Sequence, residues 1–311
     1  MKLFRRAGIV LSLLAAAGIS FGAWNHFVHN SVDTASSYIN SLPSVFENYF
    51  EKAEDVLHAS EQAEGNVFHP NIGGVEQTAE PAPESVIDLT DIPEWSGMPY
   101  ALVNDNVPFF DEQELTSMSE FMILSDKDDL GRCQANYMSV CPNSLPSEER
   151  EGIGMIKPSG WQTTRYDDLI NGKYLYNRCH LLGFQLSGLN ADDRNLITGT
   201  RYLNVDGQLP FENAVASYVR TTGNHVLYRV TPIYEGDNLV ASGVLEEGWS
   251  VEDGGEGICF CAYCYNIQPG IEIDYADGTS IESADALNDI ETALSYGATS
   301  VAGGDDPFLG G

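Results

Sequence analysis

The chain has 311 residues, of which 43% are hydrophobic and 20% charged, and its formal net charge at pH 7 is −31. This length accommodates one large domain or two small ones, at about 100–200 residues per domain. The composition excludes collagen-like, coiled-coil and multi-span membrane proteins. A pI of about 4.2 argues against a protein that coats nucleic acid through bulk positive charge.

The N-terminal residues 1–24 are typical of an export segment. Lys2, Arg5 and Arg6 form a basic flank, and an uncharged run of 18 residues follows at 7–24. That length lies between a signal-peptide core and a spanning helix. The sequence leaves open a cleaved signal peptide or an uncleaved membrane anchor. Either one predicts an extracellular protein, secreted or anchored to the outer face of the membrane.

Two acidic segments flank the centre of the chain. Residues 25–91 carry twelve acidic residues and one lysine, and we expect an acidic tether with one helix at 45–62. A solvated spacer is favoured over a binding site for an unknown protein partner. The other segment, 277–311, is acidic and Gly-rich, with a short helix predicted over 281–296.

Residues 92–276 alternate short β-rich segments with turns and one clear helix, which predicts an α+β domain. The helix is expected at 210–221, with Pro210 in its first turn and Gly223 after its end. Turn residues 235–238 predict a β-hairpin. The predicted strands are 100–103, 173–179, 196–198, 226–234, 239–245 and 259–267.

Positive charge is concentrated in one part of this domain. Residues 157–229 contain eight basic and six acidic residues, so this window is +2 while the remainder of the chain totals −33. A phosphate-bearing substrate would be attracted to the window and repelled elsewhere.

The same window includes an imidazole, arginines, side-chain amides and a carboxylate. In chain order these residues fall on a predicted strand, a turn, a second strand and a helix. A neutral histidine such as His180 is suited to activating water near pH 7. A hydrated Mg²⁺ needs only one or two protein oxygens, and arginines stabilise the charge that develops on a phosphate. The set therefore suits hydrolysis of a phosphodiester.

The ordered segment Tyr174–Asn213 resembles the DNA/RNA non-specific endonucleases of the ββα-metal (His-Me finger) superfamily, with particular likeness to secreted streptococcal-type DNases and DNA-entry nucleases. Weaker similarity extends over most of 92–276, including Ile92–Gly97, Leu130–Cys133 and Lys157–Trp161. The resemblance implies a ββα-metal nuclease core with a largely antiparallel sheet.

The resemblance also implies site roles. His180 matches the general base, Asn204 the asparagine that ligates Mg²⁺, and Glu212 the carboxylate that holds metal-bound water. Mn²⁺ is the expected substitute metal. The remaining implied site residues are Asn195, which orients substrate or the histidine, and the phosphate-side or supporting arginines Arg178 and Arg201.

The chain departs from the family signature at three positions. Asn177 stands in place of an Asp that could orient Arg178, and Cys179 in place of a Gly. Cys179 is expected to point to the strand face opposite His180, with consequences for packing only. Pro210 argues against a continuous helix between Asn204 and Glu212.

The sequence thus predicts an exported, Mg²⁺-dependent endonuclease that contacts the backbone phosphates of DNA, with RNA as a second candidate substrate. Two alternatives remain: a non-catalytic extracellular DNA-binding module, and a specialised toxin or DNA-uptake nuclease whose acidic segment 25–91 binds a partner. His225 is expected to be a structural residue at a strand start. Disulfide pairing of the six cysteines is left open, because an even count allows 15 complete pairings.

Overall fold

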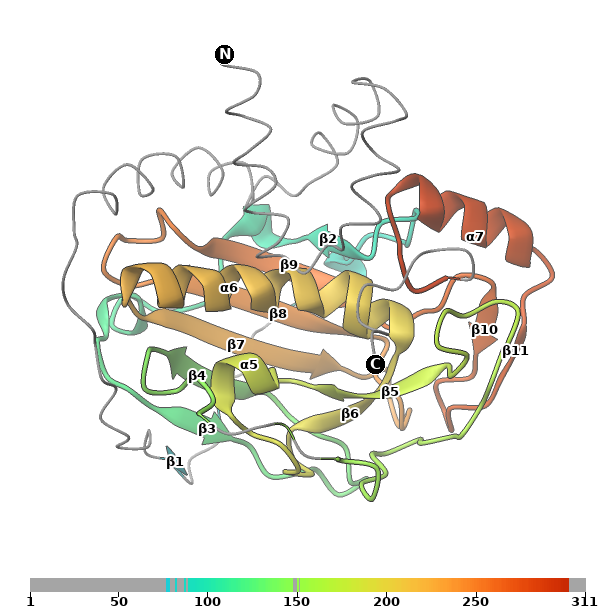
Figure 1. Cartoon of the computed structure of the whole chain (residues 1–311), viewed down its shortest axis with the longest axis horizontal. Coiled ribbons are helices and arrows are strands. Elements are labelled where there is room, and N and C mark those ends of the chain that lie inside the picture. Colours follow the sequence, from blue (N-terminus) through green and yellow to red (C-terminus); the bar gives the residue numbers. More distant parts are fainter. Residues whose placement is uncertain are drawn as a thin grey trace, which may run out of the picture. The chain divides into compact units, whose positions relative to one another are not determined.

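The computed structural model describes residues 77–78, 82, 87, 89–147, 150 and 152–301 (Figure 1). They belong to one compact unit, Pro70–Gly304. The export segment at 1–24 and the helix predicted at 45–62 lie outside the described residues. Among the described residues, no helix combines the length and apolar character needed to cross a membrane.

A seven-stranded sheet forms the centre of the unit. Every neighbouring pair in it is antiparallel except β1 and β3, which confirms the predicted α+β class with a largely antiparallel sheet. In spatial order the strands are β1 (Gln77–Thr78), β3 (Met122–Leu124), β4 (Asn136–Val140), β7 (Val226–Ile233), β8 (Gly243–Ser250), β9 (Cys259–Tyr265) and β2 (Tyr100–Leu102).

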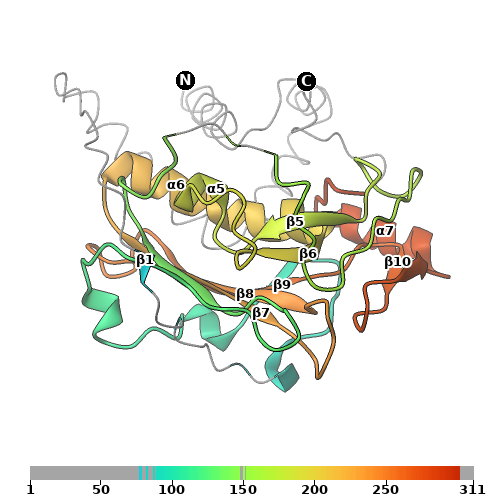
Figure 2. The same ribbon diagram turned by 90° about the horizontal axis from the view of Figure 1, so that it is seen from below.

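A separate two-stranded hairpin, β5 (Tyr176–His180) and β6 (Leu196–Thr200), lies on one face of this sheet together with α5 (Phe184–Ser187) and α6 (Leu209–Thr222) (Figure 2). Its antiparallel register sets His180 opposite Leu196, and Tyr176 opposite Thr200. Three short 3-10 helices precede or interrupt the strands: Leu89–Asp91, Asn104–Asn106 and Glu114–Thr116.

Helix α6 packs its apolar side onto the sheet. Phe211 is fully buried and contacts Tyr100 edge-on and Phe260 at a tilt, with ring centroids 5.0 and 4.8 Å apart. Such aromatic pairs add to the free energy gained by burying apolar area. The helix ends at Gly223, whose φ of 74° is the left-handed conformation that glycine adopts without a Cβ penalty.

The helix before Pro210 differs from the expectation. A π-helical segment, η4 (Leu203–Gln208), runs directly into α6, and the junction residues Gln208 and Leu209 both have right-handed helical dihedrals. The expected break between Asn204 and Glu212 is therefore wrong. Pro210 is the second residue of α6, directly after the π segment. A π segment already interrupts the regular helical hydrogen-bond ladder, which is the ladder that a proline would break.

The folded unit continues past Ala276, where the sequence placed the start of a tail. Strands β10 (Ile271–Ile273) and β11 (Ser280–Glu282) pair, and α7 (Ala286–Ser295) follows. The helix predicted from residue 281 starts later because residues 280–282 are engaged as a strand. Ile290 and Ala293 of α7 are buried against Tyr202, so this segment belongs to the core.

Candidate active site

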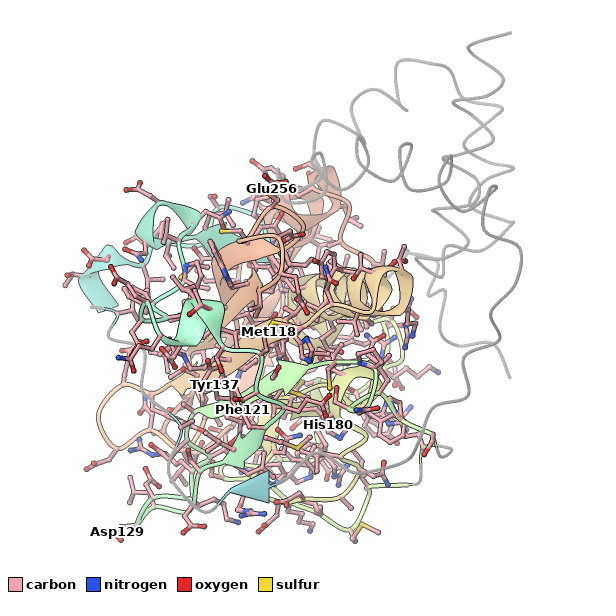
Figure 3. The ribbon with its side chains drawn as sticks, turned by 90° about the vertical axis from the view of Figure 1, so that its left-hand side faces the viewer. Met118, Phe121, Asp129, Tyr137, His180 and Glu256 are labelled. Atoms are coloured by element: carbon pink, nitrogen blue, oxygen red, sulfur yellow. The ribbon has the colours of Figure 1, made fainter. Side chains whose placement is uncertain are left out.

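His180 is the last residue of β5 and is labelled in Figure 3. Its side chain is only 7% exposed, which is deeper than expected for a group that must meet water and a phosphate. Nε2 lies 3.0 Å from the backbone oxygen of Asn190. A carbonyl oxygen can only accept, so Nε2 carries the hydrogen of the neutral ring and Nδ1 holds the lone pair.

The surroundings of His180 favour its neutral form. Burial lowers the pKa of the imidazole to about 4, and the positive charge of Arg150 acts in the same direction. Hydrogen bonds with the backbone of Asn190 and Leu189 oppose the shift but are outweighed. At neutral pH the ring is therefore uncharged and able to accept a proton.

The continuous helix presents Asn204, Gln208 and Glu212 four residues apart, along one side. Gln208 is buried, and its Nε2 donates a 3.2 Å hydrogen bond to the backbone oxygen of His180. The side of the helix that carries Gln208 therefore faces the end of β5. Asn204 is half-buried, and within the described part of the chain its side-chain amide makes no hydrogen bond.

Glu212 lies against the turn that follows His180. A Cβ placed on Gly183 would come within 2.4 Å of the Glu212 carboxylate, so the glycine leaves the space that this group occupies. Gln185 Nε2 donates to Glu212 Oε2 over 3.3 Å. Burial raises the pKa of Glu212 to about 7, while Gln185 and Arg150 act in the opposite direction.

Arg150 is a feature that the sequence did not identify. Its side chain is exposed, and it makes no hydrogen bond with any residue that the structure describes. Its charge nevertheless acts on both His180 and Glu212. A guanidinium in this position has donors left for an anion that reaches the site.

Asn195 is completely buried, and its side-chain amide makes three hydrogen bonds. Its Oδ1 accepts from the Leu182 N–H at 2.9 Å and from Asn136 Nδ2 at 3.0 Å, while its Nδ2 donates to the Leu182 carbonyl at 2.9 Å. Of the two roles the resemblance implied, this geometry suits orientation of the histidine segment, because the amide is out of reach of substrate.

The two predicted arginines lie in different places. Arg178 donates to the backbone oxygens of Ile156 and Gly154 and stacks over Trp161, with 4.1 Å between its guanidinium carbon and the ring centroid. It therefore holds the 154–156 loop. Arg201 lies against Gly172, at the end of the hairpin remote from His180.

The two substituted signature positions have different surroundings. Cys179 is fully buried, with its sulfur packed toward Gly199, as the expected packing role requires. Asn177 is half-buried, and its Nδ2 is an enclosed donor without a partner among the described residues.

The structure thus links the backbone of His180 to Gln208 and places the Glu212 carboxylate against Gly183, in the turn that follows His180. The sequence could have predicted Gln208, because it lies four residues from both Asn204 and Glu212, which is helical spacing. It could not have predicted Asn190, Gly183 or Arg150, because their contacts depend on loops whose path no local sequence pattern encodes.

Replacing Gly183 with alanine tests this arrangement. The backbone dihedrals of Gly183, φ −53° and ψ 141°, suit any residue, so only the new methyl group acts, by displacing the Glu212 carboxylate. We expect nuclease activity to fall about 10- to 100-fold, as when a group supporting a metal site is lost. Gly152→Ala is the matched control, because a Cβ there meets nothing within 4 Å. Equal activities of the two variants in plasmid digestion would contradict the arrangement.

The fold is thus a largely antiparallel α+β structure in which His180 ends a strand and its backbone contacts the helix that carries Gln208 and Glu212. Residues 127–249 match the model of the DNA/RNA non-specific endonuclease family. The resemblance predicted from the sequence is thereby confirmed: this segment is a DNA/RNA non-specific endonuclease domain, and the protein is an endonuclease.

NucA shares this fold in two solved structures. NucA from Streptococcus agalactiae with no metal bound is 21% identical, with a TM-score of 0.54 over 63% of this chain and 92% of that chain. NucA with magnesium ion bound is 20% identical, with a TM-score of 0.54 over 63% and 93%. The Sda1 nuclease with bound zinc ion is 23% identical, with a TM-score of 0.48 over 60% and 97%. A comparison with curated proteins found no match.

Proposed function

We propose that the protein is an exported, Mg²⁺-dependent endonuclease that hydrolyses DNA, and RNA as a second substrate. The observation that carries this proposal is the packing of the helix onto the end of β5: Gln208 binds the His180 backbone oxygen, and Glu212 lies against Gly183, three residues after His180. Two separate elements of the chain, a hairpin and a helix, must meet for these groups to be neighbours.

The residues present fit a hard divalent cation. Asn204 offers an amide oxygen that no described residue engages, and Glu212 offers a carboxylate that burial has desolvated. Mg²⁺ prefers oxygen ligands and retains several waters, so Asn204 would bind it directly and Glu212 would hold its water. NucA, which has the same fold, has been solved with magnesium ion bound. When bound, the cation stabilises the leaving 3′-oxygen. Mn²⁺ would substitute.

His180 then acts as the general base. Its Nδ1 lone pair takes a proton from a water molecule, while Asn190 holds the Nε2–H and so keeps the ring in the required tautomer. The resulting hydroxide attacks phosphorus, and the bond from phosphorus to the 3′-oxygen breaks, leaving a 5′-phosphate. The leaving oxygen takes its proton from solvent.

The substrate would be held through its backbone phosphates. Arg150 is an exposed cation whose charge acts on His180 and Glu212. Lys127 and Lys157 line a cavity of about 180 Å³ that also includes Ile156 and Leu196, the residue paired with His180. Cations that contact phosphates position nucleic acid without reading bases, so we expect weak sequence preference.

Export and tethering rest on the sequence alone. The basic flank and uncharged run at 1–24 direct the chain across a membrane, and the acidic 25–91 segment serves as a spacer. Membrane association follows only where the N-terminal segment is uncleaved.

Digestion of supercoiled plasmid, linear duplex, single-stranded DNA and RNA by the purified chain, with titrated Mg²⁺, tests the function. We expect cleavage of DNA that EDTA stops and Mg²⁺ restores, and ends that carry 5′-phosphates. DNA binding that persists in EDTA, with no cleavage at any Mg²⁺ concentration, would instead identify a binding module.

A further inference from the structure

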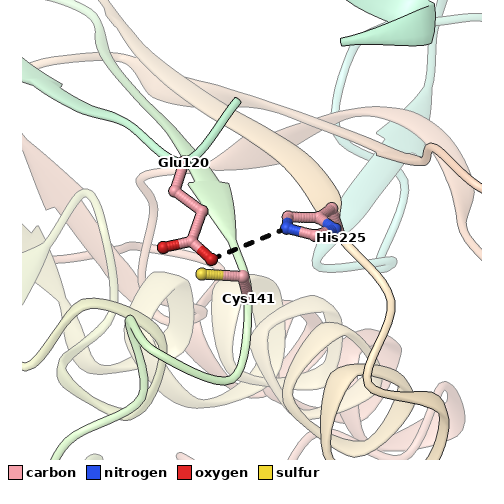
Figure 4. A group of neighbouring side chains, drawn as sticks. All are labelled: Glu120, Cys141 and His225. Carbon is pink, nitrogen blue, oxygen red and sulfur yellow. Dashed lines mark ion pairs between the residues drawn. The ribbon is translucent and has the colours of Figure 1, made fainter. Parts of the chain in front are cut away.

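A second cluster of metal-binding side chains lies at the ends of three sheet strands. Glu120 precedes β3, Cys141 directly follows β4, and His225 directly precedes β7 (Figure 4). One potential ligand atom from each, a carboxylate oxygen, Sγ and an imidazole nitrogen, all lie within 4.8 Å of one another. None of the three belongs to the site around His180.

The sheet register explains why they meet. Val140 pairs with Val226, so Cys141 and His225 are the next opposed positions of β4 and β7. The Ser139 N–H donates to the Phe121 carbonyl, which places Glu120 beside the end of β4. Antiparallel neighbours have Cβ atoms about 4.5–5.5 Å apart, within reach of one shared ion.

His225 is oriented in the way that metal-ligating histidines are. Its Nδ1 lies 2.6 Å from Glu252 Oε1, and its backbone N–H donates to Glu252 Oε2 at 2.8 Å. The carboxylate can only accept, so in the neutral ring Nδ1 carries the hydrogen and Nε2 presents its lone pair to Glu120 and Cys141. A carboxylate behind a histidine is the usual outer support of a metal-bound imidazole.

The three groups already interact with one another. The Cys141 thiol hydrogen-bonds with Glu120, His225 and Glu120 form a long ion pair, and Asn143 Nδ2 donates to both Glu120 oxygens. His225 Nε2 and Glu120 Oε1 are 3.9 Å apart, which is too long for a hydrogen bond. Zinc bond lengths place neighbouring tetrahedral ligands about 3.3–3.7 Å apart. Because the ligand atoms lie within 4.8 Å of one another, closing the cluster onto an ion requires each pair to approach by at most about 1.5 Å.

We propose that Glu120, Cys141 and His225 form a zinc-binding site separate from the nuclease centre, supported by Glu252. A thiolate, an imidazole and a carboxylate are ligands that Zn²⁺ accepts together and Mg²⁺ does not prefer. Water takes the fourth position, since Glu120 and His225 retain some exposure. The bound ion ties together β3, β4 and β7, and so raises thermal stability. This inference does not depend on the proposed nuclease mechanism.

Cobalt titration of the reduced full-length His180→Ala variant, in excess Mg²⁺, tests the site. We expect one Co²⁺ per chain, a thiolate-to-cobalt charge-transfer absorption, and displacement by Zn²⁺. Cys141→Ser in the same background should abolish the band. Glu252→Gln should weaken binding about 10- to 100-fold, as loss of an outer-shell partner does. Zn²⁺ should also raise the melting temperature of the parent variant but not of the Cys141→Ser variant.

Cys259→Ser is the matched control, because Cys259 is a half-buried thiol outside the cluster, and it should retain the band. Absence of the band in the parent protein, or its persistence after Cys141→Ser, would overturn the proposal. If Cys141→Ser does not fold, His225→Gln with all thiols intact replaces it, with loss of tight cobalt binding as the expected result. Nuclease activity enters none of these measurements.

Discussion

Replacing His180 with alanine is expected to abolish detectable plasmid digestion, with kcat/KM lowered about 10³-fold. General bases contribute about 10²- to 10⁴-fold, and no other described imidazole lies near the β5 end, since His225 belongs to the cluster at the other strand ends. Initial rates on supercoiled plasmid in saturating Mg²⁺ measure the effect.

Two further measurements separate loss of the base from loss of the fold. The variant should melt cooperatively and still bind DNA in EDTA. The pH dependence of the wild type adds a test. With a pKa of about 4, His180 stays neutral as the pH falls from 7 to 5, whereas Glu212, with a pKa of about 7, takes up a proton. Loss of activity over that range is therefore expected from Glu212, and a Glu212→Gln variant should not show it. Near-normal digestion by a folded His180→Ala variant would reject the mechanism.

Replacing Asn204 with alanine is expected to lower activity about 10²-fold or more at a fixed, subsaturating Mg²⁺ concentration. The amide is the direct oxygen ligand proposed for the cation, and loss of a ligand weakens both metal binding and stabilisation of the leaving oxygen. Asn204→Asp keeps an oxygen ligand and should retain more activity than Asn204→Ala. Activity measured across an Mg²⁺ titration distinguishes weaker binding from a slower chemical step.

Asn288→Ala is the control for the Asn204 variants, because Asn288 is an exposed asparagine in a helix, α7, away from the site. It should match the wild type in activity and in Mg²⁺ requirement. An Asn204→Ala variant with an unchanged Mg²⁺ dependence would remove Asn204 from the metal site.

Much of the fold was predictable because its longest elements carry strong local patterns. The α6 helix, with Pro210 near its start and Gly223 at its end, was predicted within a residue at each end. The β7–β8 hairpin was also recognised, although β8 begins at Gly243 rather than at residue 239. Strands β3 and β4 were missed. Both are short; β4 is defined by its pairing with β7, far away in the sequence, and β3 by its pairing with β4.

The site was predictable only as an ordered set of residue types. The resemblance proposed His180, Asn204 and Glu212, and the helix that joins the last two was misjudged, because the rule against proline in helices does not anticipate a preceding π segment. Likewise, no spacing rule connects Glu120, Cys141 and His225, whose proximity depends on strand register rather than on distance along the chain.

The clamp that Asn195 places on the backbone of Leu182 has a consequence for turnover. Two hydrogen bonds in the buried core hold the turn after His180, and a third, from Asn136, holds Asn195 itself. The imidazole is then preorganised, and little reorganisation energy is needed when a phosphate approaches. Loosening this distant amide would therefore slow the chemical step while leaving the affinity for DNA almost unchanged.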